Sequence, residues 1–329
     1  MPFSPLPETP AFLDRGRPDV PDIVVPRGIT PFYLPRRPVR GRLIRFGGLA
    51  DALLTRHHHH PAVTRLAGEA LALAAGLATA LKFQGSFSVQ AKGDGAVPML
   101  LADCTDGGAL RGYARPEPER LAKTLEQGPE PTARGLLGAG YLAFTVDQGS
   151  DRERHQGIVA VEGETLAEMA LHYFATSEQL RCHVHLACDK GPDGWRAGAL
   201  ILERVAQDGG LELPAEGEDD TQDEESWRTA TVLAATLTDA ELLDEELPSE
   251  RLLYRLFGSE GGVVLERSRA LSYGCRCSRA RLLNILKGFP AEDLDHMTRE
   301  DGQIAMTCEF CNYDFLFPRT DVRGKDEAA

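Results

Sequence analysis

Two close pairs of cysteines near the C-terminal end constrain this chain more than any other feature. The first pair is Cys275-Arg276-Cys277, the second is Cys308-Glu309-Phe310-Cys311, and 30 residues separate them. Two such pairs supply four thiolates, which is a complete ligand set for a tetrahedral metal site and most often for zinc. Thiols held this close are also thiols that an oxidant can join. A structural site and a redox-sensitive site therefore both remain open at this point.

The residues between the two pairs predict a small folded module. Helices are expected at residues 278–286 and from residue 289 onward, and residues 302–306 are expected to lead as a strand into Cys308. Because four sulfurs complete the coordination, His296 is expected at the surface, and hydrolytic zinc catalysis is disfavoured. Arginines that could offset the negative charge of such a centre are Arg276, Arg279 and Arg281.

Composition is that of an ordinary globular protein. Hydrophobic residues make up 42% and charged residues 26% of the 329 positions, enough for two or three domains. No apolar run approaches the ~20 residues that span a bilayer, and no basic start followed by an apolar stretch predicts export. Seven cysteines in such a chain favour a reducing cytoplasmic location and metal or redox use over a disulfide framework.

Negative charge is concentrated in one segment. Residues 211–250 hold 14 acidic residues and one basic residue, so they carry −13 of the formal net charge of −14. The remainder of the chain is close to neutral and has no basic surface for nucleic acid. The charge pattern therefore disfavours a nucleic-acid-binding finger.

The N-terminal part divides into a leader and a sheet-rich core. Ten of the 21 prolines fall in the first 40 residues, which predicts a disordered leader over residues 1–27. Residues 28–208 predict a globular core of class α+β, an antiparallel sheet with packed helices at residues 61–82 and 164–180. Its alternating segments, separated by turn residues, are 39–45, 83–91, 97–103, 109–114, 141–146 and 156–161.

Two stretches in the core contain metal-ligand residue types but favour other interpretations. The run from His57 to His60 favours a helix end or a loop, because adjacent side chains point in different directions and cannot converge on one ion. Farther along, strand alternation places Cys182 and Cys188 on one face, about 20 Å apart, and His183 and His185 on the other. Both cysteines are expected to be ordinary buried residues.

An acidic, leucine-bearing segment joins the core to the cysteine module. Its first half, to about residue 225, is almost free of apolar residues and predicts a loose loop. Leucines then return at helical spacing, but self-repulsion should leave these helices marginally stable unless they dock. Residues 209–270 are therefore expected to be a metastable helical linker, either solvated or conditionally folded. Neutralising acids between Glu216 and Glu225 is expected to raise the threshold for its release.

Several motifs together resemble one known family. They are Cys275-Arg276-Cys277-Ser278-Arg279, Glu300-Asp301-Gly302, Cys308-Glu309-Phe310-Cys311, Leu81-Lys82-Phe83-Gln84-Gly85, Gln90-Ala91-Lys92-Gly93-Asp94-Gly95, Arg111-Gly112-Tyr113-Ala114-Arg115 and the run from Gln156 to Ala167. With them, the chain from about Val39 onward resembles the 33-kDa redox-regulated heat-shock chaperone (33-kDa chaperonin, holdase) family. The Pro-rich leader, the four-histidine run and the start of the acidic linker depart from the family pattern.

This resemblance implies a molecular chaperone that works by binding, without ATP and without enzymatic turnover. Residues 28–208 would be the client-binding and dimerisation core, residues 209–270 the linker, and residues 271–325 a zinc-binding redox-switch domain. The reduced protein is implied to be an inactive monomer with one Zn²⁺. The implied zinc ligands are Cys275, Cys277, Cys308 and Cys311.

The resemblance also implies how such a protein becomes active. Peroxide with heat, or hypochlorous acid, would form the disulfides Cys275–Cys277 and Cys308–Cys311 and expel zinc. The linker would then unfold, and a dimer would hold unfolding client proteins. Candidate client-binding residues are the linker leucines Leu233, Leu237, Leu242 and Leu243.

Two alternatives from other classes stay open. A thiol–disulfide oxidoreductase would use Cys308 and Cys311 as its redox pair, although no thioredoxin-like βαβ pattern precedes them. Turnover of a small disulfide would identify it. A zinc-ribbon module would bind protein or nucleic acid, and salt-dependent RNA or DNA binding would identify it.

Overall fold

The computed structural model describes residues 23–35, 37–79, 84–128, 130–148, 155–205 and 219–324. The chain divides into a large unit, Asp22–Gly274, and a small unit that contains the chain from Cys275 onward. Of the leader expected at residues 1–27, residues 1–22 lie outside the described part. The expected start of the cysteine domain at residue 271 falls inside a strand of the large unit, four residues before the small unit begins.

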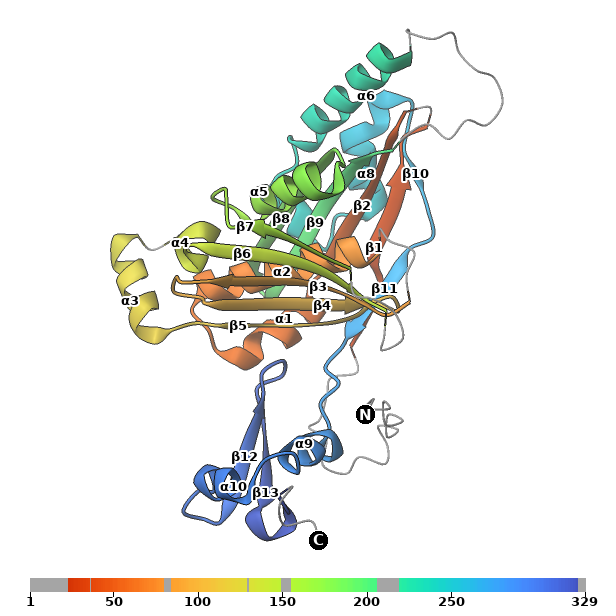
Figure 1. Cartoon of the computed structure of the whole chain (residues 1–329). Coiled ribbons are helices and arrows are strands. Elements are labelled where there is room, and N and C mark those ends of the chain that lie inside the picture. The colour runs from red at the N-terminus through yellow and green to blue at the C-terminus, as the bar shows by residue number, and fades with distance from the viewer. Residues whose placement is uncertain are drawn as a thin grey trace. The chain divides into compact units, whose positions relative to one another are not determined.

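One extended sheet forms the large unit (Figure 1). Its strand order is β7-β6-β3-β4-β5-β11-β1-β2-β9-β8, with β10 beside β1. The strands are β1 (Val24–Tyr33), β2 (Val39–Phe46), β3 (Ser86–Gly93), β4 (Met99–Thr105), β5 (Ala109–Arg115), β6 (Gly140–Asp147), β7 (His155–Ala160), β8 (Cys182–Gly191), β9 (Gly194–Arg204), β10 (Val264–Leu265) and β11 (Arg269–Tyr273). Neighbours are antiparallel except β5 and β11, which run parallel. The α+β prediction is confirmed.

The first strand begins inside the stretch expected to be a leader. β1 starts at Val24, and its valines pair with β11 as Val24↔Ser272 and Val25↔Leu271. β-Branched residues fit an extended, half-buried strand. Pro26 falls where the register shifts between Val25 and Ile29, a position that tolerates its missing N–H. Because β11 lies beyond the linker in the sequence, no local pattern revealed this pairing.

Helices α1 (Gly48–Leu54), α2 (Pro61–Ala78) and α5 (Leu166–Tyr173) pack on one face of the sheet, with short turns η2 (Thr55–His57) and η3 (Phe174–Glu178). Helix α4 (Ala133–Leu137) adjoins β3, and α3 (Pro118–Gln127) buries no side chain and lies beside α4. Helix α2 is the buried core helix that its small residues predicted. A Cβ at Gly76 would lie 2.5 Å from Ile201 Cδ1, and one at Gly68 would lie 2.2 Å from Cys188 Sγ. Only glycine lets α2 approach β8 and β9 this closely.

The linker is docked on the opposite face of β1, β2, β8 and β9. Its elements are α6 (Asp219–Ala234), α7 (Asp239–Leu243), α8 (Ser249–Phe257) and η4 (Gly258–Glu260). We call the apolar surface beneath them the platform; it consists of Phe32, Leu34, Val39, Leu43, Ala187, Leu200 and Leu202. Buried linker residues that pack on it are Trp227, Ala230, Ala234, Leu237, Leu242, Leu252, Leu253, Leu256 and Phe257. The linker is therefore helical and, in this state, folded against the core.

The loose loop expected up to about residue 225 is wrong from residue 219 onward; residues 209–218 lie outside the described part. Helix α6 begins at Asp219, so seven residues expected in the loop, 219–225, are helical. Glu224 explains part of this, because its carboxylate pairs with Arg181 at 2.9 Å and with Arg204 at 3.1 Å. The acidic side chains are therefore not merely self-repelling, since some are neutralised by arginines of the core.

Variants of two adjacent acidic residues can distinguish ion pairing with the core from self-repulsion within the linker. Replacing Glu224 by glutamine should lower the temperature at which the linker leaves the core, because two ion pairs are lost. Replacing Glu225, an exposed neighbour, should leave that temperature unchanged or raise it slightly through reduced self-repulsion. Limited proteolysis of the linker against temperature measures both. Equal shifts of the same sign for the two variants would contradict this account.

The small unit has little core of its own. It contains α9 (Arg279–Leu286), α10 (Ala291–Met297), β12 (Gln303–Cys308), β13 (Tyr313–Pro318) and η5 (Arg319–Asp321). Beside the cysteines, its buried side chains are Leu286, Leu294, Ile304, Phe315, Phe317 and Val322. So few apolar side chains cannot by themselves stabilise a module of this size. In the described part of the chain, no helix has the length and apolarity needed to cross a membrane.

Candidate metal centre

Local structure places each cysteine pair. Cys308 ends β12, and the tight turn to β13 is closed by the N–H groups of Cys311 and Asn312, which donate to the Cys308 carbonyl at 3.3 and 2.7 Å. Asn312 adopts the left-handed region with φ of 53°, which asparagine tolerates. The other pair lies between β11 and α9, and the Ser278 hydroxyl caps α9 by accepting from the Arg281 N–H at 3.1 Å. The predicted helix and strand around the pairs are confirmed.

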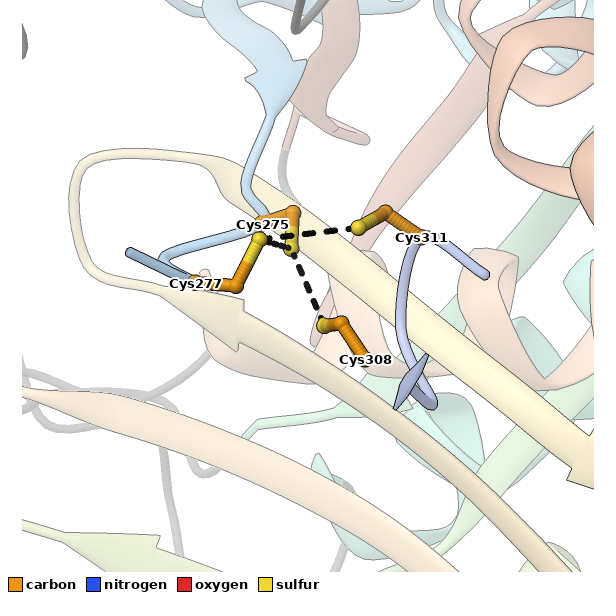
Figure 2. A group of neighbouring side chains, drawn as sticks. All are labelled: Cys275, Cys277, Cys308 and Cys311. Atoms are coloured by element: carbon orange, nitrogen blue, oxygen red, sulfur yellow. Dashed lines mark hydrogen bonds between the residues drawn. The ribbon is translucent and has the colours of Figure 1, made fainter. Parts of the chain in front are cut away.

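The four cysteine side chains converge on one point from these two segments (Figure 2). The Sγ atoms of Cys275 and Cys277 are 3.4 Å apart, those of Cys275 and Cys308 3.7 Å, and those of Cys277 and Cys311 3.5 Å. All four Sγ atoms lie within 4.8 Å of one another. The four side chains are buried, with 2% to 9% of each residue exposed.

This geometry fits a tetrahedral metal site. With metal–sulfur distances of about 2.3 Å, the corners of a tetrahedron are about 3.8 Å apart, close to the separations seen here. Four ligands from the protein leave no open position for a substrate. Among the described residues, this is the one group of three or more potential ligands gathered closely enough to hold an ion. The cluster can therefore bind a metal and fix its module.

The thiols also influence one another's ionisation. The hydrogen bond with Cys277 lowers the pKa of Cys275 to about 7, and hydrogen bonds from Cys275 and then Cys277 hold the pKa of Cys308 well below its usual range. Hydrogen bonding to Cys275 instead raises the pKa values of Cys277 and Cys311. The four thiols therefore titrate as one coupled group, and metal binding would displace the protons that the group still carries.

One of the arginines considered as a charge partner has another role. The Arg279 guanidinium stacks on the Phe317 ring at 4.4 Å and donates to the Leu316 carbonyl at 2.7 Å. Arg279 therefore ties α9 to β13. His296 is exposed on α10, as expected.

Two of the three cysteines outside the cluster are poorly suited to react. Burial raises the pKa of Cys182 to about 12, and burial followed by the nearby Glu69 carboxylate raises the pKa of Cys188 still further. Cys188 packs against α2, on the face of β8 that alternation predicted. These thiols stay protonated near neutral pH, so oxidants should act first on the cluster.

The four-histidine run has a structural role. The His60 side chain caps α2 by accepting from the Ala62 N–H at 3.3 Å, and the rings of His57 and His59 stack at 5.3 Å. Burial lowers the pKa of His59. The predicted helix-end interpretation is confirmed, since the run joins η2 to α2.

Linker docking involves core residues for which the sequence analysis did not predict this role. His185 was expected to face outward, but its Nε2 lies 2.7 Å from an Asp239 oxygen of α7. Arg45 donates from Nε to the Leu242 carbonyl at 2.9 Å and from Nη1 to the Leu247 carbonyl at 2.6 Å. In the sequence, the one indication of this role was an arginine at an inward-facing position of a strand, and such a position does not identify the group that the arginine contacts.

Glu69 supplies a pH-dependent test of the docked state. It lines a cavity of about 900 Å³ beside Asp239 of the linker. Burial, and then the Asp239 charge, raise its pKa from 4.5 to about 7. Between these pH values the unfolded chain has lost the Glu69 proton while the folded protein keeps it, so this group reduces stability as pH rises through the window.

Glu69→Gln should therefore flatten the fall in thermal stability across that pH range and stabilise the reduced protein at pH 8. Melting curves at several pH values measure this. Glu126→Gln, on the exposed face of α3, is the matched control and should behave like the parent protein. An unchanged pH slope in Glu69→Gln would contradict the assignment.

Fold and site together define an α+β protein with a docked helical linker and a four-thiolate metal-binding module. The Hsp33 protein family model matches residues 28–318, and the chain belongs to this family of chaperones. The chain is 41% identical over 288 residues to the 33 kDa chaperonin of Caulobacter vibrioides, which covers 86% of this chain and 92% of that protein. It is 36% identical over 293 residues to the 33 kDa chaperonin of Pseudomonas fluorescens, covering 88% and 90%.

The fold also matches a solved structure. The crystal structure of the 33 kDa chaperonin (heat shock protein 33 homolog) of Thermotoga maritima superposes with a TM-score of 0.72, over 90% of this chain and 96% of that one. At 21% identity, this similarity concerns the fold alone. The family resemblance predicted from the sequence motifs is confirmed.

Proposed function

We propose that this chain is a redox-regulated, ATP-independent holdase. It is inactive while the four thiolates hold Zn²⁺ and active once they are oxidised. The observation that carries the proposal is the convergence of the four buried Sγ atoms within 4.8 Å of one another, in a chain of this chaperone family. Its function is binding of unfolding proteins, not catalytic turnover.

Zinc is the ion that best suits this cluster. Four thiolates in tetrahedral arrangement are a soft, closed ligand set, and zinc takes such sets in structural sites. Cys275, Cys277, Cys308 and Cys311 would hold one ion. When bound, it supplies the folding free energy that the small apolar core of the module lacks, about 10–16 kcal/mol in small zinc modules.

Oxidation would remove these ligands in pairs. Each disulfide forms when two thiolates lose two electrons. One molecule of hydrogen peroxide accepts these electrons together with two protons from solvent and is reduced to two molecules of water. The pairs proposed are Cys275–Cys277 and Cys308–Cys311, in which one and two residues separate the cysteines. Once both are disulfides, no thiolate remains to hold the ion, and the small unit loses its main source of stability.

Loss of the module would then free the linker. β11 leads directly into Cys275 and is the C-terminal anchor of the linker in the sheet. Unfolding beyond Cys275 frays this anchor and favours the undocked linker. The four candidate leucines support this order of events: Leu237 and Leu242 are buried on the platform, and Leu233 and Leu243 pack against it in part. They could meet clients only after release.

We expect the second pair to oxidise before the first. A disulfide across one intervening residue closes a more strained ring than one across two, so Cys275–Cys277 should form later. Mass spectrometry of samples quenched during peroxide treatment resolves the order. Appearance of Cys275–Cys277 before Cys308–Cys311 would contradict this prediction.

The proposal also covers the oligomeric state, the location and the partners of the protein. The reduced protein would be a monomer and the oxidised protein a homodimer, since released apolar surface favours association. A reducing cytoplasm would keep the thiols ready to bind zinc. Neither nucleic acid nor membrane is proposed as a partner.

The decisive experiment measures three quantities on one sample before and after peroxide at mild heat. They are zinc content, free thiols, and suppression of aggregation of an unfolding test protein. One zinc and four thiols should disappear together as holdase activity appears. Constant activity, or zinc that stays bound, would reject the regulation. Turnover of a small disulfide would favour the oxidoreductase, and salt-dependent RNA binding the zinc ribbon.

A further inference from the structure

The platform beneath the linker has a cationic rim. The six core side chains that form it are Arg37, Arg45, Arg181, His185, Arg196 and Arg204. Their ion pairs to the linker are Arg37–Glu260 at 3.0 Å, Arg181–Glu224 at 2.9 Å, Arg204–Glu224 at 3.1 Å and Arg196–Glu245 at 3.5 Å. His185 Nε2 lies 2.7 Å from an Asp239 oxygen, a contact that is an ion pair only when the imidazole is protonated. The centre of the platform is apolar, so an apolar floor is bordered by positive charge.

Two rim arginines also donate to backbone carbonyls of the linker, and these hydrogen bonds do not depend on the side chains of the linker. Arg45 donates to the carbonyls of Leu242 and Leu247, and Arg196 donates to the Leu243 carbonyl at 3.4 Å. Leu242 and Leu243 end helix α7, where free carbonyls and the negative end of the helix dipole meet the cations. Any short helix that ends at this position could be held in the same way.

The positive charge of the rim outweighs the core carboxylates that reach it. Asp193 pairs with Arg196 at 3.3 Å, and Glu69 lies near Asp239. Arg45 Nη2 is buried and has no hydrogen-bond partner in the described part of the chain. When the linker leaves, its acidic partners leave with it, and the rim loses the ion pairs that these carboxylates make with Arg37, Arg181 and Arg196. The apolar side chains that the rim surrounds become exposed at the same time.

We propose that the uncovered platform selects client segments that resemble the linker, namely acidic, leucine-bearing segments that can form short helices, and disfavours basic ones. This inference rests on the proposed holdase function and names its preferred client chemistry. The apolar floor supplies affinity for leucines. The rim supplies discrimination, because a carboxylate can replace a lost ion pair and a lysine in its place is repelled.

Three peptides labelled with a fluorophore test this on the oxidised full-length chain. The first has the sequence of residues 219–257. The second replaces each of its Asp and Glu residues by Lys. The third is an unrelated acidic amphipathic peptide of equal length and net charge. Anisotropy titrations should show that both acidic peptides bind at least about tenfold more tightly than the lysine peptide, with the difference reduced at 0.5 M salt.

A charge reversal on the rim checks the location. Arg181→Glu should weaken the binding of both acidic peptides and strengthen the binding of the lysine peptide. Lys123→Glu on α3, which lies outside the platform, should change neither affinity. Equal affinity for the acidic and the lysine peptides would overturn the inference. So would tight binding of the linker peptide without tight binding of the unrelated acidic peptide.

The holdase proposal and this inference can fail separately. If the oxidised protein does not prevent aggregation, the holdase proposal fails. The same titrations on reduced Phe257→Ala protein, in which the linker is expected to be released without oxidation, then still decide the charge preference. If aggregation is prevented but the peptides are not distinguished by charge, only this inference fails.

Discussion

Replacing Phe257 by alanine should make the reduced, metal-bound protein active as a holdase without any oxidant. The Phe257 ring is fully buried and stacks on Phe32 of the platform, with 5.6 Å between ring centroids. Truncating a buried phenylalanine costs about 3–5 kcal/mol, and each ~1.4 kcal/mol changes an equilibrium tenfold. The equilibrium constant for docking of the linker should therefore fall by two orders of magnitude or more.

Suppression of aggregation by the reduced variant, together with faster proteolysis of the linker, measures this release. Tyr254→Ala is the matched control, because Tyr254 lies on the same helix but is 68% exposed. It should remain inactive until oxidised. Circular dichroism and retention of zinc establish that the core and the module of each variant are folded. An inactive, proteolysis-resistant Phe257→Ala protein would show that docking on the platform does not restrain activity.

Replacing Cys308 by serine should remove the metal and activate the chain constitutively. Cys308 supplies one of four converging sulfurs, and its Sγ lies 3.7 Å from that of Cys275. An uncharged hydroxyl is a poor zinc ligand, and the module has few apolar side chains to remain folded without the ion. Zinc content should drop from about one per chain to near zero, and holdase activity should no longer require peroxide.

Cys182→Ser is the control for this experiment. Cys182 is a half-buried thiol on β8 and is not part of the cluster. Its replacement should leave zinc content and the requirement for oxidant unchanged. If Cys308→Ser keeps its zinc, or loses zinc but stays inactive, then metal release and activation are not coupled as proposed.

Together, these variants separate two restraints on the linker. The first is the platform, where apolar side chains and arginines hold α6 to α8 directly. The second, in the proposed mechanism, is the small unit, which would act through the chain connection at β11. Phe257→Ala removes the first and leaves the metal in place, whereas Cys308→Ser removes the second and leaves the platform intact. A linker that needs both restraints is released by either change.

The sequence alone was sufficient to predict the four-cysteine cluster and most of the helices and strands. Cysteine spacing predicts four converging thiolates because the two cysteines of each pair are only two or three positions apart and can therefore ligate the same ion. Alternation predicts β3 to β7, because the period of a half-buried strand is local. The small residues of α2 predicted its close contact with the sheet, and Gly68 and Gly76 lie at the closest points. These features depend on neighbours along the chain.

Other features were decided only by the tertiary structure. Val24 pairs with Ser272 across the whole core and linker, Arg45 holds the carbonyls of Leu242 and Leu247, and Glu224 meets Arg181 and Arg204. A charged or extended segment has no preferred partner in its own sequence, because the partner is chosen by which surfaces the fold brings together. The acidic stretch thus predicts repulsion when considered alone and becomes a docking surface when the core supplies arginines. The sequence determined the chemistry of the metal site, and the fold determined what the linker covers.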